Sequence, residues 1–314
     1  MSHSEKNIVK KPIKYIGNIV TILAIVFIIR VMLSFDIDTS IIKNKSLFIT
    51  SSIFGIFIMC STVYLIAYGW KIILTVLSNH TVNYSDASFV YTKANMGKYL
   101  PGNVMHYVER NLFAGNLGLN QKTVLLSTVI EIIGQVSVCL LAGVILERKR
   151  IIAISLEILQ TQYIIIFAVL LCILLAGIII FRDKIKKILS DISITALIKA
   201  FIRVIPIYLT FVLLGSLVLV VIFTSTTNGD MSHNTILSIV AAYTTAWVLG
   251  FIVPGSPGGI GVREFVLLFL LRDLFPEPVI LTCILVHRMI SVLGDVFAYL
   301  ISILRNKLRS SSVL

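Results

Sequence analysis

The fold of this chain is decided by a stretch rich in glycine and proline between two apolar blocks. It reads Gly250-Phe251-Ile252-Val253-Pro254-Gly255-Ser256-Pro257-Gly258-Gly259-Ile260-Gly261-Val262-Arg263-Glu264. The block Ile236–Val253 precedes the turn and Val262–Phe275 follows it. Proline removes a backbone donor and disfavours helix at the residue before it, whereas glycine permits a turn. The stretch therefore predicts a helix that breaks and then resumes.

A second stretch repeats this pattern earlier in the chain. It reads Gly97-Lys98-Tyr99-Leu100-Pro101-Gly102-Asn103-Val104-Met105-His106-Tyr107-Val108-Glu109-Arg110. Both stretches contain Gly, three residues, Pro-Gly, seven residues and then Arg. Two broken helices in the two halves of a membrane chain are typical of an inverted repeat with a site between the halves. We expect halves of about 1–160 and 161–314; the alternative is a chance match in which the prolines form ordinary loop turns.

The composition is that of a membrane protein. Of the 314 residues, 57% are hydrophobic and 13% are charged, whereas a soluble domain carries about 25% charged residues. The apolar residues fall in blocks of about 20, the length that crosses the hydrocarbon core. We therefore predict an all-α, polytopic bundle with about eight spans in one domain, residues 1–314. The blocks are Ile16–Phe35, Leu47–Trp70, Thr123–Leu146, Tyr163–Phe181, Val204–Phe223, Ile236–Val253, Val262–Phe275 and Val279–Leu304.

The segment from Asp86 to Gly118 does not fit a span. After Asp86 at its start, it contains four further charged residues, Lys93, Lys98, Glu109 and Arg110. Each charge at the bilayer centre costs at least ~2.5–3.5 kcal/mol. We expect a broken hairpin or a surface helix here, because backbone that leaves a spanning helix is tolerated where protein surrounds it.

Basic clusters between the apolar blocks indicate the orientation. The N-terminal lysines, the run at 182–187 and the tail at 305–309 fall on one side, which should be cytoplasmic, whereas the cluster at 147–150 falls on the other. Both termini are then expected in the cytoplasm. The net charge of +12 is explained by these clusters, so nucleic-acid binding is not expected.

The broken helices have a chemistry suited to anions. The half-helix after each break presents free N–H groups and the positive end of its dipole. Arg110 and Arg263 follow the breaks and can add a fork of donors for phosphate, and Glu109 and Glu264 flank them. The remaining candidates are the proline breaks and their glycines: Pro101, Gly102, Pro254, Gly255, Pro257, Gly258 and Gly259.

Charged residues inside apolar helices add further candidates. Glu131, Arg288 and Asp295 lie within predicted spans, and intramembrane charge is by default a hypothesis of function. The alternative is structural pairing between helices, for example of Glu131 with Arg288. The histidines His106 and His287 either relay protons or only hydrogen-bond a neighbour.

The part of the first stretch from Pro254 to Glu264, followed by an apolar helix, resembles a signature of the lysylphosphatidylglycerol synthase transmembrane region family. Gly97–Gly102 resembles the other signature of that family, although Glu131-Ile132 stands where members often have Glu-Arg. The resemblance extends over nearly the whole chain and implies a flippase-like protein of the inner (cytoplasmic) membrane. It implies an anionic or aminoacylated phospholipid, or a polyprenyl-phosphate-linked saccharide, as substrate. The family's synthase domain is absent, so aminoacylation is not implied.

We therefore expect a transporter, without catalytic residues, cofactor or metal. The alternative enzyme is a membrane glycosyltransferase that uses a polyprenyl-phosphate sugar, with Asp36 and Asp38 as its acids. A third hypothesis is a non-transporting assembly factor that works with envelope-synthesis proteins. No phosphate-binding Walker loop or dinucleotide fingerprint occurs in the sequence.

Overall fold

The computed structural model describes most of the chain outside the N-terminal region and residues 147–192. The described residues are 39–78, 80–100, 104–115, 118–146, 193–226, 231–252 and 257–311. Every regular element in these ranges is a helix, which confirms the all-α prediction.

Five of the helices are long and apolar enough to cross a membrane. They are α2 (Lys45–Ser78), α5 (Gln121–Leu146), α9 (Ile194–Thr226), α10 (His233–Ile252) and α12 (Glu277–Ser311). Each contains one of the predicted apolar blocks almost completely, so the protein is embedded in a membrane. The predicted spans 16–35 and 163–181 lie outside the described residues.

The predicted span Val262–Phe275 is wrong as a full crossing. Helix α11 covers Val262–Leu271, and its 10 residues extend about 15 Å, half of the hydrocarbon thickness. The chain then turns before α12 begins at Glu277. This block is a half-helix after the break, and the count of about eight spans stays a prediction.

The segment at 84–114 forms a broken hairpin, as one of the two sequence alternatives predicted. It contains α3 (Tyr84–Asn95), the 3-10 helix η2 (Met96–Tyr99) and α4 (Met105–Ala114). The Asn83 side chain caps the N-terminus of α3, because it accepts a hydrogen bond from the Ser85 N–H at 2.8 Å. We call α3, η2 and α4 the first hairpin.

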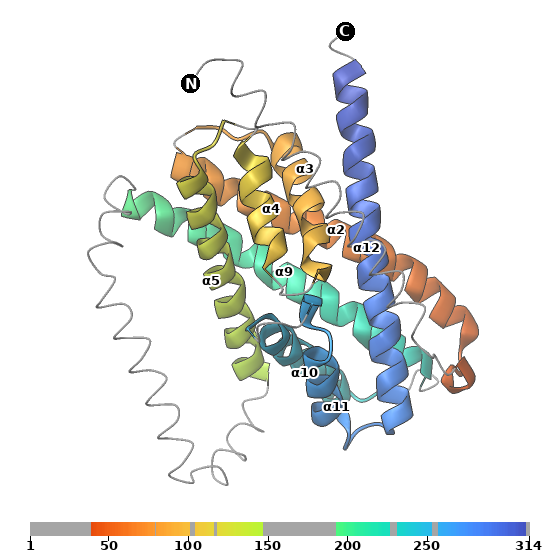
Figure 1. Cartoon of the computed structure of the whole chain (residues 1–314). Helices are drawn as coiled ribbons and strands as arrows, with labels where there is room; N and C mark the ends of the chain where they lie inside the picture. Colours follow the sequence, from red (N-terminus) through yellow and green to blue (C-terminus); the bar gives the residue numbers. More distant parts are fainter. Residues whose placement is uncertain are drawn as a thin grey trace, which may run out of the picture.

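The second hairpin has the same outline. It consists of α10, the 3-10 helix η4 (Pro257–Gly259) and α11. The two hairpins approach from opposite ends of the molecule, and their tips meet in the middle (Figure 1). At this junction a Cβ built on Gly258 would lie 3.6 Å from the Tyr99 ring. Opposed hairpins are what an inverted repeat requires, but the repeat itself stays a prediction.

Long helices surround the two tips. Helix α2 packs along α9 and α12 (Figure 1). The Trp70 side chain is fully buried, and its indole N–H donates to Ser127 Oγ at 2.9 Å, which ties α2 to α5. The tips are therefore enclosed by the long helices.

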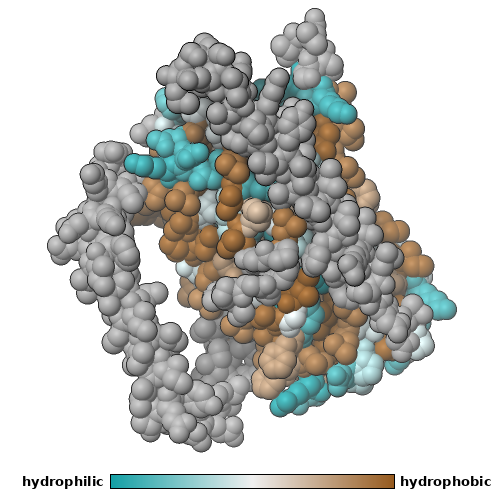
Figure 2. Space-filling view, viewed as in Figure 1, coloured by the Kyte–Doolittle hydropathy of each residue, from teal (hydrophilic) through white to brown (hydrophobic). Residues whose placement is uncertain are grey.

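The outer surface is largely apolar. Large hydrophobic side chains are exposed along α2, α5, α9 and α12, including Phe57, Ile145 and Leu304. Figure 2 shows hydrophobic residues over the middle of the visible face, with hydrophilic residues gathered toward its upper and lower ends. Such a broad apolar belt suits contact with lipid rather than water.

Candidate functional site

A cavity of about 170 Å³ lies where the hairpin tips meet. Both hairpins line it, together with α2, α5, α9 and α12. The cavity is large enough for several water molecules or a small polar group. The candidates predicted from sequence that line it are Arg110, Glu131, Gly258, Arg263, Glu264, Arg288, Asp295, His106 and His287.

Arg110 is buried and neutralised. Its Nη1 donates to Glu131 Oε2 at 2.9 Å, and both side chains are 3% exposed. The Tyr91 hydroxyl donates to the other carboxylate oxygen at 2.9 Å. The guanidinium also lies over the rings of Tyr91, Trp70 and Tyr107 at 4.2, 5.2 and 5.6 Å. A cation with a carboxylate and three rings around it is a packed structural group rather than an open binding site.

The expected pairing of Glu131 with Arg288 is wrong. Glu131 lies on α5, which packs against α4, and α4 presents Arg110 to it. Arg288 on α12 instead donates to Glu264 Oε1 on α11 at 2.6 Å. Each carboxylate therefore pairs with a cation of a helix that packs against its own, α4 for Glu131 and α12 for Glu264.

Glu264 has two partners at the second tip. Its Oε1 accepts from Arg288, and its Oε2 accepts from the Gly261 N–H at 2.6 Å. It therefore caps the first turn of α11 and occupies the positive dipole end that was expected to receive an anion. Arg288 also donates to the Gly258 carbonyl at 3.4 Å, so α12 holds the second tip by charge.

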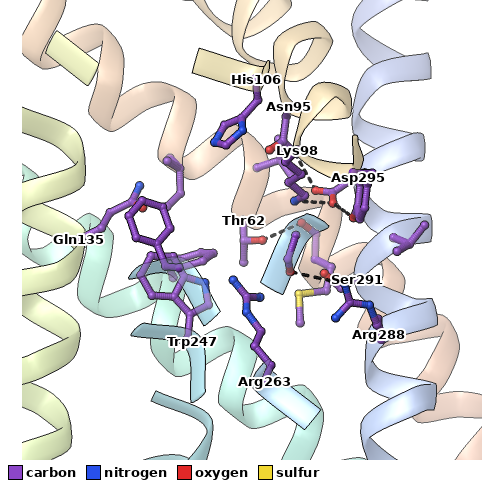
Figure 3. Close-up of a pocket in the computed structure, with 18 of the residues that line it drawn as sticks. Thr62, Asn95, Lys98, His106, Gln135, Trp247, Arg263, Arg288, Ser291 and Asp295 are labelled. Carbon is purple, nitrogen blue, oxygen red and sulfur yellow. Dashed lines mark hydrogen bonds and ion pairs between the residues drawn. The ribbon is translucent and has the colours of Figure 1, made fainter. Parts of the chain in front are cut away.

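Asp295 holds the first tip to α12 in the same way. It is buried and accepts from Lys98 Nζ at 2.6 Å, from Asn95 Nδ2 at 2.8 Å and from the Tyr99 hydroxyl. Figure 3 shows Lys98 and Asn95 converging on this carboxylate. The sequence did not predict Lys98 as a site residue. A lysine in a largely apolar chain that also has an intramembrane aspartate is the sequence feature that could have indicated this pair.

Arg263 differs from the other cations in the cavity. Its side chain passes between two glycines: a Cβ on Gly250 would lie 2.4 Å from its Cγ, and a Cβ on Gly259 would lie 2.7 Å from its Nε. Gly259 has a φ of 79°, in the left-handed region that glycine adopts without strain. These two glycines of the sequence pattern therefore make room for the arginine.

Within the described part of the chain, no carboxylate forms a salt bridge with Arg263. Its Nε is buried and has no hydrogen-bond partner. The guanidinium lies 5.8 Å from the Trp247 ring, and Figure 3 shows it pointing into the cavity. Arg263 is therefore a buried cation that has no carboxylate partner among the described residues.

The charges that line the cavity do not balance. The cations are Lys98, Arg110, Arg263 and Arg288, and the carboxylates are Glu131, Glu264 and Asp295. Three ion pairs use all three carboxylates, which leaves one positive charge, that of Arg263. An excess cation surrounded by protein favours an anionic ligand.

The other predicted residues have mixed outcomes. Pro101, Gly102, Pro254 and Gly255 lie outside the described residues, and so do Asp36 and Asp38. Pro257 begins η4. Glu109 is buried but lies behind the first tip and does not line the cavity. Among the described residues, no cluster of three or more His, Cys, Asp or Glu could hold a metal ion.

Comparison with protein-family models, with curated proteins and with solved structures finds no match. The candidate function therefore depends on the chemistry of the cavity.

Proposed function

We propose that this protein moves the phosphate-bearing head group of a lipid across the membrane. The observation that carries the proposal is Arg263, a buried guanidinium without a counter-charge, at the junction of two opposed hairpins. A buried charge without a partner costs several kcal/mol. A phosphate that enters the cavity removes this cost, which gives the anion its affinity.

The geometry of arginine favours phosphate over other anions. Its planar guanidinium presents paired N–H donors that match two phosphate oxygens. The Arg263 Nε is free to serve as one of these donors. A lipid also suits the surroundings, because its tail can stay in the apolar belt while only the polar head enters the cavity.

The substrate class is an anionic or aminoacylated phospholipid, or a polyprenyl-phosphate-linked saccharide. All three carry the phosphate that Arg263 can bind. The resemblance of Gly97–Gly102 and Pro254–Glu264 to the lysylphosphatidylglycerol synthase transmembrane region supports this choice and a place in the cytoplasmic membrane. Transport, not group transfer, is the activity proposed.

Two ion pairs suggest how access alternates. We call Lys98–Asp295 the first-tip pair and Glu264–Arg288 the second-tip pair. Both are anchored on α12, at positions seven residues or about two turns apart, so they lie on one face of that helix. A phosphate at Arg263 attracts Lys98 or Arg288 away from its carboxylate. Release of one pair at a time opens one tip while the other stays closed, as alternating access requires.

The test is transport by the purified protein in liposomes. The probe is a short-chain fluorescent phosphatidylglycerol, whose head-group accessibility is measured on each leaflet. We expect Arg263→Ala to lower the rate to that of protein-free liposomes. The matched control is Arg272→Ala at the end of the same helix, where the side chain is 61% exposed; it should keep the wild-type rate.

Three results would contradict the proposal. Wild-type rates in Arg263→Ala would remove the guanidinium from the mechanism. Transport that needs added envelope-synthesis proteins would favour the assembly factor. Sugar transfer that is lost when Asp36 and Asp38 are both changed to Asn would favour the glycosyltransferase.

A further inference from the structure

Glu109 is a buried acid that the proposed transport step does not use. Its side chain lies on α4, and the residue is only 2% exposed. Neither carboxylate oxygen has a hydrogen-bond partner. Buried polar groups are nearly always hydrogen-bonded, so this exception requires an explanation.

The carboxyl group lies against the backbone of the first tip. A Cβ built on Gly97 would be 2.7 Å from Glu109 Oε2 and 3.1 Å from the His106 backbone nitrogen. Only a glycine at position 97 leaves space for this side chain. Glu109 therefore fills the gap between α4 and η2 and does not line the cavity, whereas Lys98 and Tyr99 of the same tip do.

Several charged or titratable groups surround Glu109. Lys93 on α3 and Tyr299 on α12 are the titratable groups that interact with it across the interface. The Lys93 ammonium lies over the Phe113 ring at 4.3 Å. On α4 itself, Arg110 pairs with Glu131. None of the salt bridges between described residues includes Glu109.

An ionised carboxylate in this position would have no hydrogen bond and little contact with water, although Lys93 attracts it. Buried charges without hydrogen bonds are costly, and such groups tend to take up a proton instead. The closed arrangement of the first tip therefore favours the neutral acid. Ionisation would draw the side chain toward water, and this requires α4 to separate from η2.

We propose that Glu109 is a proton-binding site whose protonation closes the first tip, so that the pH on the side of this tip controls head-group movement. A proton from the aqueous phase on the side of the open first tip binds one carboxylate oxygen and gives the neutral acid. The tip then closes and Lys98 reaches Asp295. When the tip reopens, the O–H bond breaks and the proton returns to the same water. This control rests on the proposed function, because it assumes that the tips control access to Arg263.

The proton site can be tested without any transport. Infrared difference spectra of the purified protein, recorded across a pH titration, report the C=O stretch of a buried protonated acid. We expect this band in the wild type, its loss in Glu109→Gln, and its return at a shifted position in Glu109→Asp. Glu277→Gln, at the exposed start of α12, is the matched control and should keep the band.

The pH control is tested in liposomes that have the same pH on both sides, over a series of pH values. The wild type should move the phosphatidylglycerol probe more slowly as the pH falls, by up to about tenfold per unit of pH, because the ionised fraction of a single acid changes by at most that factor. Glu109→Gln should move the probe slowly and at the same rate at every pH, because glutamine imitates the protonated acid and holds the first tip closed.

The outcomes separate the two proposals. If the wild type moves no probe, the proposed function fails and the infrared band alone decides whether Glu109 binds a proton. If the wild type moves the probe and Glu109→Gln keeps the wild-type pH dependence of the rate, the control by Glu109 is wrong. An infrared band that is unchanged in Glu109→Gln would overturn the proton site itself.

Discussion

The two hairpins share a sequence pattern and have opposite electrostatics. In the first hairpin the arginine, Arg110, is paired, and the adjacent Glu109 forms no hydrogen bond or salt bridge with the described residues. In the second hairpin Glu264 is paired, and the adjacent Arg263 forms no salt bridge with a described carboxylate. The first hairpin thus holds an acid that is suited to bind a proton. The second holds a cation that is suited to bind an anion.

This difference arises from the neighbouring helices. The local pattern determines where the backbone breaks, because proline and glycine act on the residues next to them. The partner of each charge is supplied by another helix, α5 for Arg110 and α12 for Glu264. Similar motifs in a repeated fold can therefore have different functions, and the pairing of their charges shows which function each one has.

The largest expected effect separates the two arginines by stability. Arg110→Ala leaves Glu131 buried without a counter-charge, which should cost about 3–5 kcal/mol of unfolding free energy. Arg263→Ala removes an unpaired charge and should leave stability unchanged or slightly higher. Denaturant unfolding of the purified variants measures both.

A second substitution sharpens this comparison. Adding Glu131→Gln to Arg110→Ala removes the unpaired negative charge of Glu131. The double variant should recover a large part of the lost unfolding free energy. Equal unfolding free energies for Arg110→Ala and Arg263→Ala would show that the two environments are not different.

An intermediate effect is expected where α12 holds the first tip. Asp295→Asn removes the negative charge that binds Lys98 and should loosen the tip. The buried Met96 of η2 reports this when it is replaced by cysteine in a background without other cysteines. We expect maleimide to label Met96→Cys several-fold faster in the Asp295→Asn variant.

Asp86→Asn is the control for that labelling experiment. Asp86 pairs with Arg309 at 2.7 Å, but both side chains are at least 36% exposed, and exposed pairs contribute only ~0–1 kcal/mol. The labelling rate should not change. An unchanged rate in Asp295→Asn as well would mean that the first-tip pair does not hold the tip.

The smallest effect concerns the glycines that surround Arg263. Gly259→Ala places a side chain at a φ of 79° and 2.7 Å from Arg263 Nε. The left-handed backbone alone costs about 1–2 kcal/mol, and the displaced arginine should lower the transport rate severalfold.

Gly115→Ala is the matched control, because its Cβ would meet nothing within 4 Å. Its φ of −58° is helical, so stability and transport should stay at wild-type values. If Gly259→Ala behaves like this control, Arg263 does not depend on the space that Gly259 leaves.

The sequence predicted the helices and their breaks because both depend on local chemistry. Apolar blocks of about 20 residues predict spans. The prediction of a span at Val262–Phe275 was wrong because a half-helix is as apolar as a helix that crosses the whole membrane. The pairing of charges could not be predicted in this way. Asp295 and its partner Tyr99 are 196 residues apart, and only the packing of α12 against η2 brings them together.

The same limit applies to the candidate site. Arg110 and Arg263 have the same position in the pattern, so the sequence predicted the same role for both. The aromatic cage of Arg110 comes from α2, α3 and α4, and no spacing rule relates residues of separate helices to one guanidinium. The role of Arg263 as an anion site stays a prediction.

The most direct test of that role is equilibrium binding of short-chain phosphatidylglycerol to the purified protein, measured calorimetrically in detergent. A hydrogen bond to a charged group contributes about 1.5–3 kcal/mol, so Arg263→Ala should weaken binding about tenfold to a hundredfold. Arg272→Ala should bind as the wild type does. Equal affinity in the wild type and Arg263→Ala would contradict the claim that the unpaired guanidinium receives the phosphate.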